Sequence, residues 1–272
     1  MRRHISRLLL LCSHWSFSKA AFLASTSSKS NYKDKYYRGG DSNSSRDLHL
    51  SKPNIPLEHY DFSSQNGWDD FYTVNSSSSS SFEFEWHASI PHAHILQQIR
   101  SKQTVLLVGN GNSRLPRDIA DEVSLEEVSV TCMDYSRPCI DALQIFYGDD
   151  YSNVEFLCGD VTDLSQLLEG RKYDVVVDKG LMDALMCSDG WEGHQQVGKV
   201  RQYWRNVGKV LAEGGKIVLM LYKVSKATRE FLEEVGEEME VNWVEDEDKG
   251  DGRVSFLIGT RCRAVGVLDN II

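Results

Sequence analysis

From about residue 90 onward, short apolar runs alternate with segments in which apolar residues recur at helical spacing. A continuous apolar run that ends in glycine or an acid is typical of a strand buried in a parallel sheet. Strands are therefore expected at residues 104–109, 128–134, 154–160, 173–180 and 215–222. The helical spacing predicts helices at residues 90–100, 115–123, 138–147, 195–211 and 226–239. This alternation indicates an α/β fold, a doubly wound sheet with helices on both faces.

The end of the chain carries a different pattern, with two strand-like runs in succession. Residues 240–246 and 253–262 each form such a run, and an acidic turn containing glycine, Glu245 to Gly252, joins them. A short turn of this kind favours antiparallel pairing. We therefore expect a mostly parallel seven-stranded sheet with an antiparallel C-terminal hairpin.

The first 33 residues differ from the rest in charge. They contain six basic residues and no acid, and the remainder carries a formal charge of −16 once they are set aside. An Arg- and Ser-rich leader without acids resembles a mitochondrial transit peptide. A secretory or plastid signal and an uncleaved, untargeted tail remain open, because Arg2 and Arg3 precede an apolar stretch. The leading expectation is a mitochondrial protein, and a cytoplasmic location is the alternative.

Residues 34–66 are rich in polar side chains and predict a disordered linker. At residue 67 the composition changes, and two aromatic clusters, GWDDFY at 67–72 and FEFEWH at 82–87, flank a run of serines. Aromatic residues at this density pack either as a satellite of the core or over a ligand. We place the folded domain at residues 67–264.

Composition and charge narrow the classes of function. The chain has 272 residues, 41% hydrophobic and 26% charged, with a formal net charge of −10. An acidic protein lacks the basic face that drives general nucleic-acid binding, so a basic partner is expected. No apolar run approaches the roughly 18 residues of a membrane-spanning helix, so we expect no membrane partner. The six cysteines show no zinc-type spacing and indicate buried thiols in a reducing compartment.

The candidate chemistry lies where the predicted strands end, because ligands of doubly wound sheets bind at the carboxyl ends of the strands. Gly109 and Gly111 follow the first strand and allow a ligand to approach the backbone. Asp134 ends the second strand, where a carboxylate can accept both hydroxyls of a ribose. These features fit a dinucleotide or a nucleoside equally well.

Two further features favour a nucleoside. Arg114 stands where a dinucleotide fold has its third glycine. Asp160 and Val161 close the third strand, where an acid can accept the exocyclic amine of adenine and valine can contact the ring. Glycine loop, ribose acid and adenine acid in this order point to S-adenosylmethionine rather than a nicotinamide cofactor. Each acid taken alone is equally typical of a helix N-cap.

Six motifs carry a resemblance to a known family. In order they are GWDDFY, FEWH, VLLVGNGNS, MDYS, GD and DKGLMDAL. The chain resembles the class I seven-strand, Rossmann-like methyltransferases of the methyltransferase-like 13 and elongation factor 1-alpha lysine methyltransferase group. The mitochondrial citrate synthase lysine methyltransferase is related to this group. The similarity covers roughly residues 67–264 and departs from the family at Asn110, at Leu181–Met182 and in the longer serine run.

The resemblance implies an enzyme that transfers a methyl group from S-adenosylmethionine to a protein lysine, with an elongation factor or citrate synthase as the kind of substrate protein. It also implies which residues contact the cofactor: Trp68, Tyr72, Trp86, Gly109, Asp134, Tyr135, Asp160, Val161 and Lys179. Methyl transfer from a sulfonium depends mainly on positioning, and aromatic faces can shield the cation.

Removing the proton from a lysine ammonium is the remaining chemical demand. Asp178 and Asp183 are the candidate catalytic residues for this step, and the alternative for Asp178 is a helix N-cap or a strand-end turn former. His87, His92 and His94 lack acid or cysteine ligands at a useful spacing, so no metal is expected.

Other functions remain open at this stage. Another acceptor, either a small molecule or a protein N-terminus, fits the same fold. A catalytically silent scaffold that binds the cofactor or a partner protein is the second alternative.

Overall fold

The computed structural model describes residues 60–62, 64–75, 83–122, 127–186, 193–222, 224–249 and 252–262, with side chains omitted at 75 and 193–197. Residues 1–59, which include the predicted leader and most of the predicted linker, lie outside this range. The serine run and the residues after 262 lie outside it as well.

A seven-stranded sheet in the order β3-β2-β1-β4-β5-β7-β6 forms the centre of the molecule. The five parallel strands are β1 (Thr104–Val108), β2 (Ser129–Asp134), β3 (Val154–Cys158), β4 (Tyr173–Lys179) and β5 (Leu211–Tyr222). Their residues are almost all buried in β1, β2 and β4, as apolar runs predict for strands covered on both faces. The doubly wound, mostly parallel fold is confirmed.

The C-terminal hairpin consists of β6 (Val241–Glu245) and β7 (Val254–Arg261). Strand β7 pairs antiparallel with both β5 and β6, so it lies inside the sheet and β6 forms the edge. The predicted antiparallel hairpin is confirmed.

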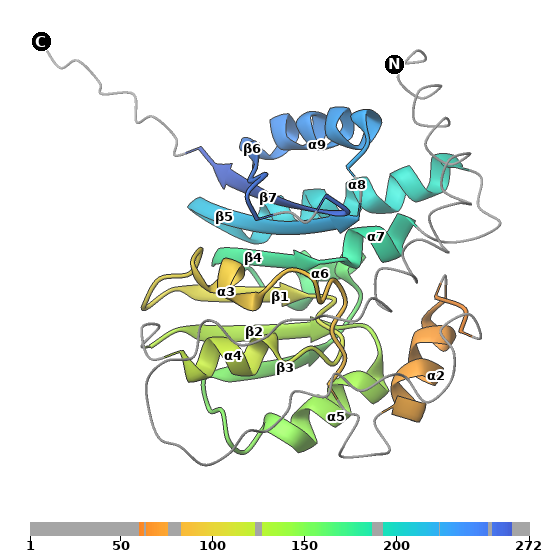
Figure 1. Cartoon of the computed structure of the whole chain (residues 1–272), viewed down its shortest axis with the longest axis vertical. Coiled ribbons are helices and arrows are strands. Elements are labelled where there is room, and N and C mark those ends of the chain that lie inside the picture. The colour runs from red at the N-terminus through yellow and green to blue at the C-terminus, as the bar shows by residue number, and fades with distance from the viewer. Residues whose placement is uncertain are drawn as a thin grey trace, which may run out of the picture.

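Helices cover both faces of the sheet (Figure 1). One buried cluster joins the sheet to α3 (His92–Leu96), α4 (Leu115–Asp121) and α5 (Arg137–Tyr147). The other joins it to α6 (Leu164–Leu167), α8 (Gly193–Val210) and α9 (Lys226–Met239). The short η3 (Val161–Asp163) and α7 (Leu181–Met186) follow β3 and β4 directly. Both lie where ligands of such sheets bind.

The N-terminal part of the domain differs from the prediction. Residues Gln65–Asn75 form a helix, α2, and Tyr60 and Phe62 before it are buried in the same core cluster. The predicted linker at 34–66 is therefore wrong at its end, because these two rings pack on Phe71 at centroid distances of 5.3 and 5.6 Å. The domain begins at or before residue 60.

The helix expected at residues 90–100 is shorter than predicted. It spans His92–Leu96, and Pro91 occupies the N-cap position with an extended backbone. The following residues make tight turns instead, among them Lys102 in the left-handed region at φ 64°.

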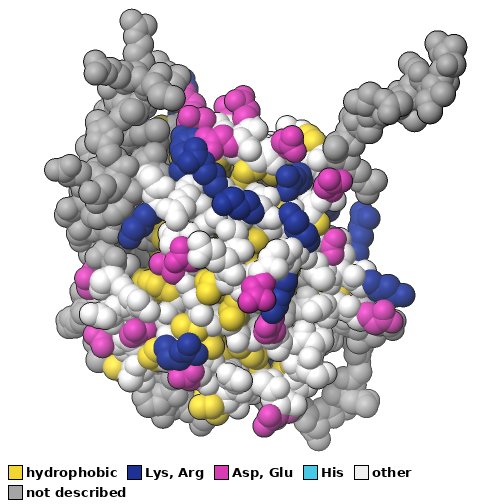
Figure 2. All heavy atoms as spheres, turned by 180° about the vertical axis from the view of Figure 1, so that it is seen from behind, with side chains coloured by type: hydrophobic (Ala, Val, Ile, Leu, Met, Phe, Trp, Pro, Cys, Tyr) yellow, Lys and Arg dark blue, Asp and Glu magenta, His cyan; other side chains and the backbone are white. Residues whose placement is uncertain are grey.

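The back face of the molecule, where α6 and α8 lie, shows acidic and basic side chains mixed together (Figure 2). Part of this mixing is explained by pairs between α8 and α9, in which Arg201 and Arg205 bind Glu238 and Arg201 also binds Glu234. None of the helices within the described part of the chain is long and apolar enough to cross a membrane.

Candidate active site

A cavity of about 370 Å³ lies at the carboxyl ends of the parallel strands. Helix α2 lies to the right of the arrowheads of β2 and β3, and α7 to the right of β4 (Figure 1). Of the predicted cofactor-binding residues, all but Gly111 line the cavity: Trp68, Tyr72, Trp86, Gly109, Asp134, Tyr135, Asp160, Val161 and Lys179. The structure therefore brings together residues that span more than a hundred positions of sequence.

The glycine loop forms one wall of the cavity. Gly109 and Gly111 have φ of 58° and 57°, a conformation that side chains with a Cβ rarely adopt. A Cβ at Gly109 would lie 2.8 Å from the side chain of Leu181, and one at Gly111 would lie 2.5 Å from the hydroxyl of Tyr72. Glycine is needed here both for the turn and for the close approach of neighbouring side chains.

The carboxylate of Asp134 is buried beside this loop. Its Oδ2 accepts a hydrogen bond from the amide of Gly111 at 2.9 Å, and its Oδ1 accepts one from the amide of Ser136 at 3.0 Å. Burial raises the pKa of Asp134 to about 6, although these amides act in the opposite direction. Each oxygen retains a lone pair, so the group can still accept hydroxyl donors from a ligand in the cavity.

The acid at the end of β3 is arranged differently. Asp160 is exposed, and its Oδ1 accepts hydrogen bonds from the amide and the hydroxyl of Thr162, both at 2.8 Å. It is thus the N-cap of η3, while its Oδ2 can still accept a donor from the cavity. Val161 next to it is buried and adds an apolar surface to the wall.

Aromatic rings form the wall opposite the sheet. Trp68 stacks on Tyr72 at a centroid distance of 5.8 Å and meets Trp86 at 5.5 Å and Phe62 at 4.6 Å. Burial, reinforced by Asp134, raises the pKa of the Tyr72 hydroxyl well above its ordinary value. These rings line the cavity and are continuous with the core through Phe71. From the sequence, these aromatic residues could pack either over a ligand or as a satellite of the core. In the structure the same rings line the cavity and also contact the core.

Lys179 reaches the cavity from the end of β4 within a buried network that the sequence analysis missed. Its Nζ forms an ion pair with Glu85 and donates to the hydroxyl of Ser113 at 3.0 Å. Lys179 and His92 together hold the pKa of Glu85 well below its usual range, against the effect of burial. A signal existed in the sequence, since an acid placed between aromatic residues in FEFEWH requires a buried partner.

The two candidate catalytic carboxylates do not line the cavity. Asp178 is fully buried and accepts hydrogen bonds from the amide of Leu181 at 2.7 Å, the amide of Met182 at 3.1 Å and the hydroxyl of Tyr203 at 2.9 Å. Burial, together with the nearby charge of Asp183, raises the pKa of Asp178 to about 7. Asp178 thus lies at the end of β4 and binds the first two amides of α7, which fits the alternative of a cap or strand-end turn former.

Asp183 does not line the cavity either, although its Oδ2 would lie 4.0 Å from a Cβ on Gly180, which does. It contacts the Nε2 of His87 at 3.1 Å and accepts from the amide of Tyr222 at 2.9 Å, and only 2% of it is exposed. Both aspartates position the elements around the cavity. The assignment of Asp178 and Asp183 to proton removal stays a prediction, which these contacts do not support.

The three histidines have separate surroundings. His92 lies between Glu85, at 3.1 Å from its Nε2, and Asp118, at 2.6 Å from its Nδ1. Burial alone would lower the pKa of His92, but the two carboxylates raise it. His94 packs against the ring of Phe256 instead. Among the described residues, no group of three or more His, Cys, Asp or Glu side chains is arranged to hold a metal ion.

Further residues line the cavity that were not predicted to contact the cofactor. Gln65 anchors α2 to the β2 end of the sheet by donating to the carbonyl of Tyr135 at 2.9 Å. The other such wall residues are Phe62, Ser64, Gly159, Thr162, Gly180, Leu181, Ala184, Leu185 and Lys199.

Known proteins resemble this chain over the domain that contains the cavity. The eEF1A lysine and N-terminal methyltransferase of Mus musculus is 27% identical over 164 residues, which is 60% of this chain and 22% of that protein. Its homolog in Drosophila pseudoobscura pseudoobscura is 24% identical over 164 residues, 60% of this chain and 23% of that protein. The chain thus spans about a fifth of the length of these curated relatives.

Solved structures include a TehB-like SAM-dependent methyltransferase from Corynebacterium glutamicum, 16% identical with a TM-score of 0.46, covering 63% of this chain and 86% of that chain. The family described as "Methyltransferase domain" matches residues 99–257, which is more than half of the chain. The methyltransferase domain indicated by the sequence motifs is thereby confirmed. The chain belongs to the methyltransferase-domain family and carries a class I, S-adenosylmethionine-dependent methyltransferase domain.

Proposed function

We propose that the chain transfers a methyl group from S-adenosylmethionine to a lysine amine of a protein. The observation that carries this proposal is the convergence of Asp134, Asp160 and the aromatic wall on one cavity at the carboxyl ends of the strands. The cavity volume of about 370 Å³ lies in the range of small-molecule sites.

The residues present fit this cofactor. Asp134 would hold the ribose hydroxyls, and Asp160 with Val161 would hold the adenine. The tight turn at Gly109 leaves room for the methionine part against the backbone. When bound, the cofactor supplies a methyl group activated on a sulfonium cation. Trp68, Tyr72 and Trp86 would shield this cation from water and offer it their ring faces.

The acceptor must lose a proton before it can attack. An unperturbed lysine has a pKa near 10.4, so deprotonation at pH 7 costs roughly 4.6 kcal/mol. Among the described residues that line the cavity, the carboxylates are Asp134 and Asp160, on the adenosine side. We infer that burial among aromatic rings lowers the pKa of the acceptor amine. The residues of this chain thus act by positioning and by desolvation.

The names of the relatives indicate the class of acceptor. They describe methyltransferases of both lysine and the N-terminus of eEF1A. Both groups are primary amines of a protein, and the formal charge of −10 suits a basic protein surface. A protein N-terminus is therefore the second candidate acceptor.

The test uses purified protein with methyl-labelled S-adenosylmethionine and two extracts, one mitochondrial and one cytosolic. We expect label in a protein band and, after digestion, on a lysine side chain by mass spectrometry. Purified eEF1A and citrate synthase serve as direct candidates. Label on a small molecule would overturn the proposed acceptor class. Cofactor binding by calorimetry without transfer to either extract would support the silent scaffold instead.

A further inference from the structure

The segment 84–87 carries buried aromatic and buried polar residues in strict alternation. Phe84 and Trp86 contact each other at 5.0 Å between ring centroids and belong to the aromatic wall. Glu85 and His87, on either side of Trp86, are also buried, with 9% and 2% of their surface exposed. A buried acid and a buried histidine need partners, and the partners lie on three different elements around the cavity.

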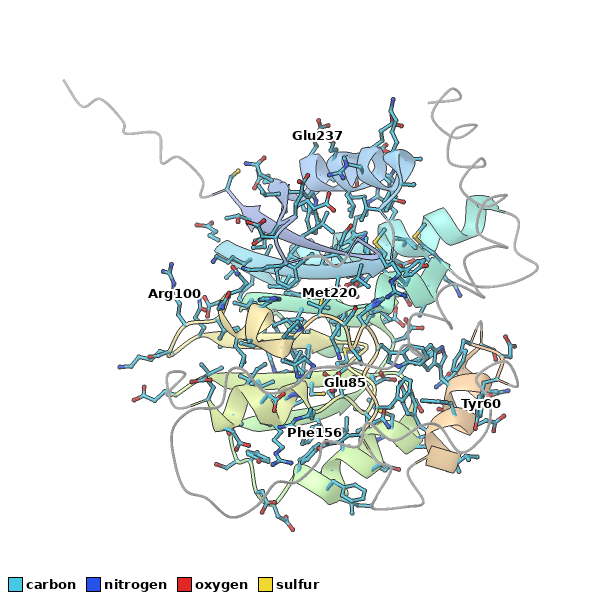
Figure 3. All side chains as sticks on the ribbon, in the orientation of Figure 1. Tyr60, Glu85, Arg100, Phe156, Met220 and Glu237 are labelled. Carbon is cyan, nitrogen blue, oxygen red and sulfur yellow. The ribbon has the colours of Figure 1, made fainter. Side chains whose placement is uncertain are left out.

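Glu85 binds the glycine loop and the end of β4 together. Its carboxylate accepts from the hydroxyl of Ser113 at 2.9 Å and from the amide of Arg114 at 2.9 Å, and it pairs with Lys179. The backbone of the same segment adds a hydrogen bond from the amide of Phe84 to the carbonyl of Asn112 at 3.4 Å. Figure 3 shows Glu85 near the carboxyl ends of the central strands.

His87 contacts Asp183 of α7, and the carboxylate of Asp183 also binds the end of β5. Its Nε2 lies 3.1 Å from Asp183, and the same carboxylate oxygen accepts from the amide of Tyr222 at 2.9 Å. A Cβ on Gly180, which lines the cavity, would lie 2.9 Å from that Nε2. His87 itself has a left-handed backbone at φ 56°, which turns the chain directly after Trp86.

We propose that Glu85 and His87 are positioning residues that clamp Trp86 in the wall of the cofactor cavity, Glu85 to the glycine loop and Lys179, and His87 to α7 and the end of β5. This inference rests on the proposed cofactor function. The clamp holds an indole that no strand or helix carries, because Trp86 lies in a turn between α2 and α3. Loss of either contact leaves the segment attached at one end, and Trp86 then no longer closes the cavity in one fixed position.

Calorimetric titration with S-adenosylmethionine tests the clamp in three variants. Glu85→Gln removes the charge that holds Lys179, and His87→Asn removes the contact with Asp183 while tolerating the left-handed backbone. Glu83→Gln is the matched control, because Glu83 directly precedes this segment but binds Tyr147 and Arg117 on the α4 and α5 side. We expect at least a tenfold higher Kd for the first two variants and less than a threefold change for the control.

A double-mutant cycle separates positioning from general stability. In a Trp86→Phe background, His87→Asn should raise the Kd less than threefold, since its effect passes through Trp86. Equal losses in both backgrounds, or an unchanged Kd in folded Glu85→Gln and His87→Asn, would overturn the clamp.

If Glu85→Gln does not fold, Glu85→Asp takes its place, and its Kd for S-adenosylmethionine should be higher than that of wild type. A wild-type Kd for Glu85→Asp would overturn the role of Glu85. A wild type that does not bind S-adenosylmethionine would instead overturn the proposed function, and the clamp with it.

Discussion

Asp134 differs from an ordinary surface aspartate in its burial and in its hydrogen bonds to the backbone. It is buried, and two backbone amides already bind its oxygens. The amides orient the carboxylate toward the cavity, while burial raises its pKa to about 6. The protonation state of this carboxyl group therefore changes near pH 6.

The affinity for S-adenosylmethionine is expected to depend on pH through Asp134. Ribose hydroxyls favour the ionised form, so the Kd should be nearly constant above pH 7 and rise up to tenfold per unit below pH 6. Asp134→Asn should weaken binding roughly ten- to hundredfold, as expected from about 1.5 to 3 kcal/mol for a charge-assisted hydrogen bond. Titration calorimetry between pH 5 and 8 measures both effects. The same pH profile in wild type and Asp134→Asn would contradict the assignment.

The contrast between Asp134 and Glu85 shows which site residues a sequence can reveal. Asp134 was predicted because strand ends of a parallel sheet meet at one edge, whatever the rest of the fold does. No comparable rule places Glu85 at the site, since its position depends on how a turn outside the sheet packs. Its partner Lys179 lies at the end of β4 and Ser113 in the glycine loop, and only the folded chain brings them together.

At the scale of elements, α7 begins directly at the end of β4 because Asp178 caps it. The carboxylate accepts from the amides of Leu181 and Met182, and the hydroxyl of Tyr203 on α8 donates to the same group. One buried side chain thus connects β4, α7 and α8 behind the cavity. This explains why an acid at a strand end can be essential without touching a ligand.

Asp178→Ala should destabilise the protein by about 2 to 4 kcal/mol, from the lost cap and the unpartnered Tyr203 hydroxyl. Urea unfolding of the two proteins measures this difference.

Stability should also depend on pH through Asp178. The folded-state pKa of Asp178, about 7, lies above that of an unfolded aspartate, near 3.9. The part of the free energy of unfolding that comes from protonation of Asp178 is therefore fully present below about pH 4 and is lost as the pH rises through 7. Urea unfolding of wild type and Asp178→Asn between pH 4 and 8 measures the difference. Asp141→Ala, an exposed site on α5, should change stability by less than about 0.5 kcal/mol.

The elements that the sequence predicted are those with long patterns of their own. The helix at 226–239 and the strands of the parallel sheet lie where the pattern placed them, within a few residues. Helix α2 was missed because its aromatic residues pack on rings before and after it, at Phe62 and Trp86, rather than along one helical stripe. Strand β5 begins four residues earlier than expected, at Leu211, where it pairs with Tyr173 beside a register shift.

At the scale of the whole molecule, the basic leader stands apart from an acidic remainder. We propose that residues 1–33 direct the chain to mitochondria, where an acidic domain would meet a different set of substrates from those in the cytosol. A fusion of this segment to a fluorescent protein should enter mitochondria, and changing Arg2, Arg3 and Arg7 to Glu should abolish entry. Fluorescence microscopy and fractionation measure the outcome. Secretion or plastid entry of the fusion would select the alternative signals.

The start of the folded domain can be located by truncation, because the rings before α2 are part of its core. Phe62 lines the cavity, its carbonyl accepts a hydrogen bond from the indole of Trp68 at 3.1 Å, and Tyr60 packs on Phe71. A chain starting at residue 60 keeps these contacts and should melt and bind S-adenosylmethionine like the full chain. A chain starting at residue 67 loses two buried rings, which stabilise the fold by about 1.5 to 3 kcal/mol each, and should melt lower and bind more weakly. Thermal melts with and without cofactor compare the two, and equal behaviour would place the start of the domain at residue 67 after all.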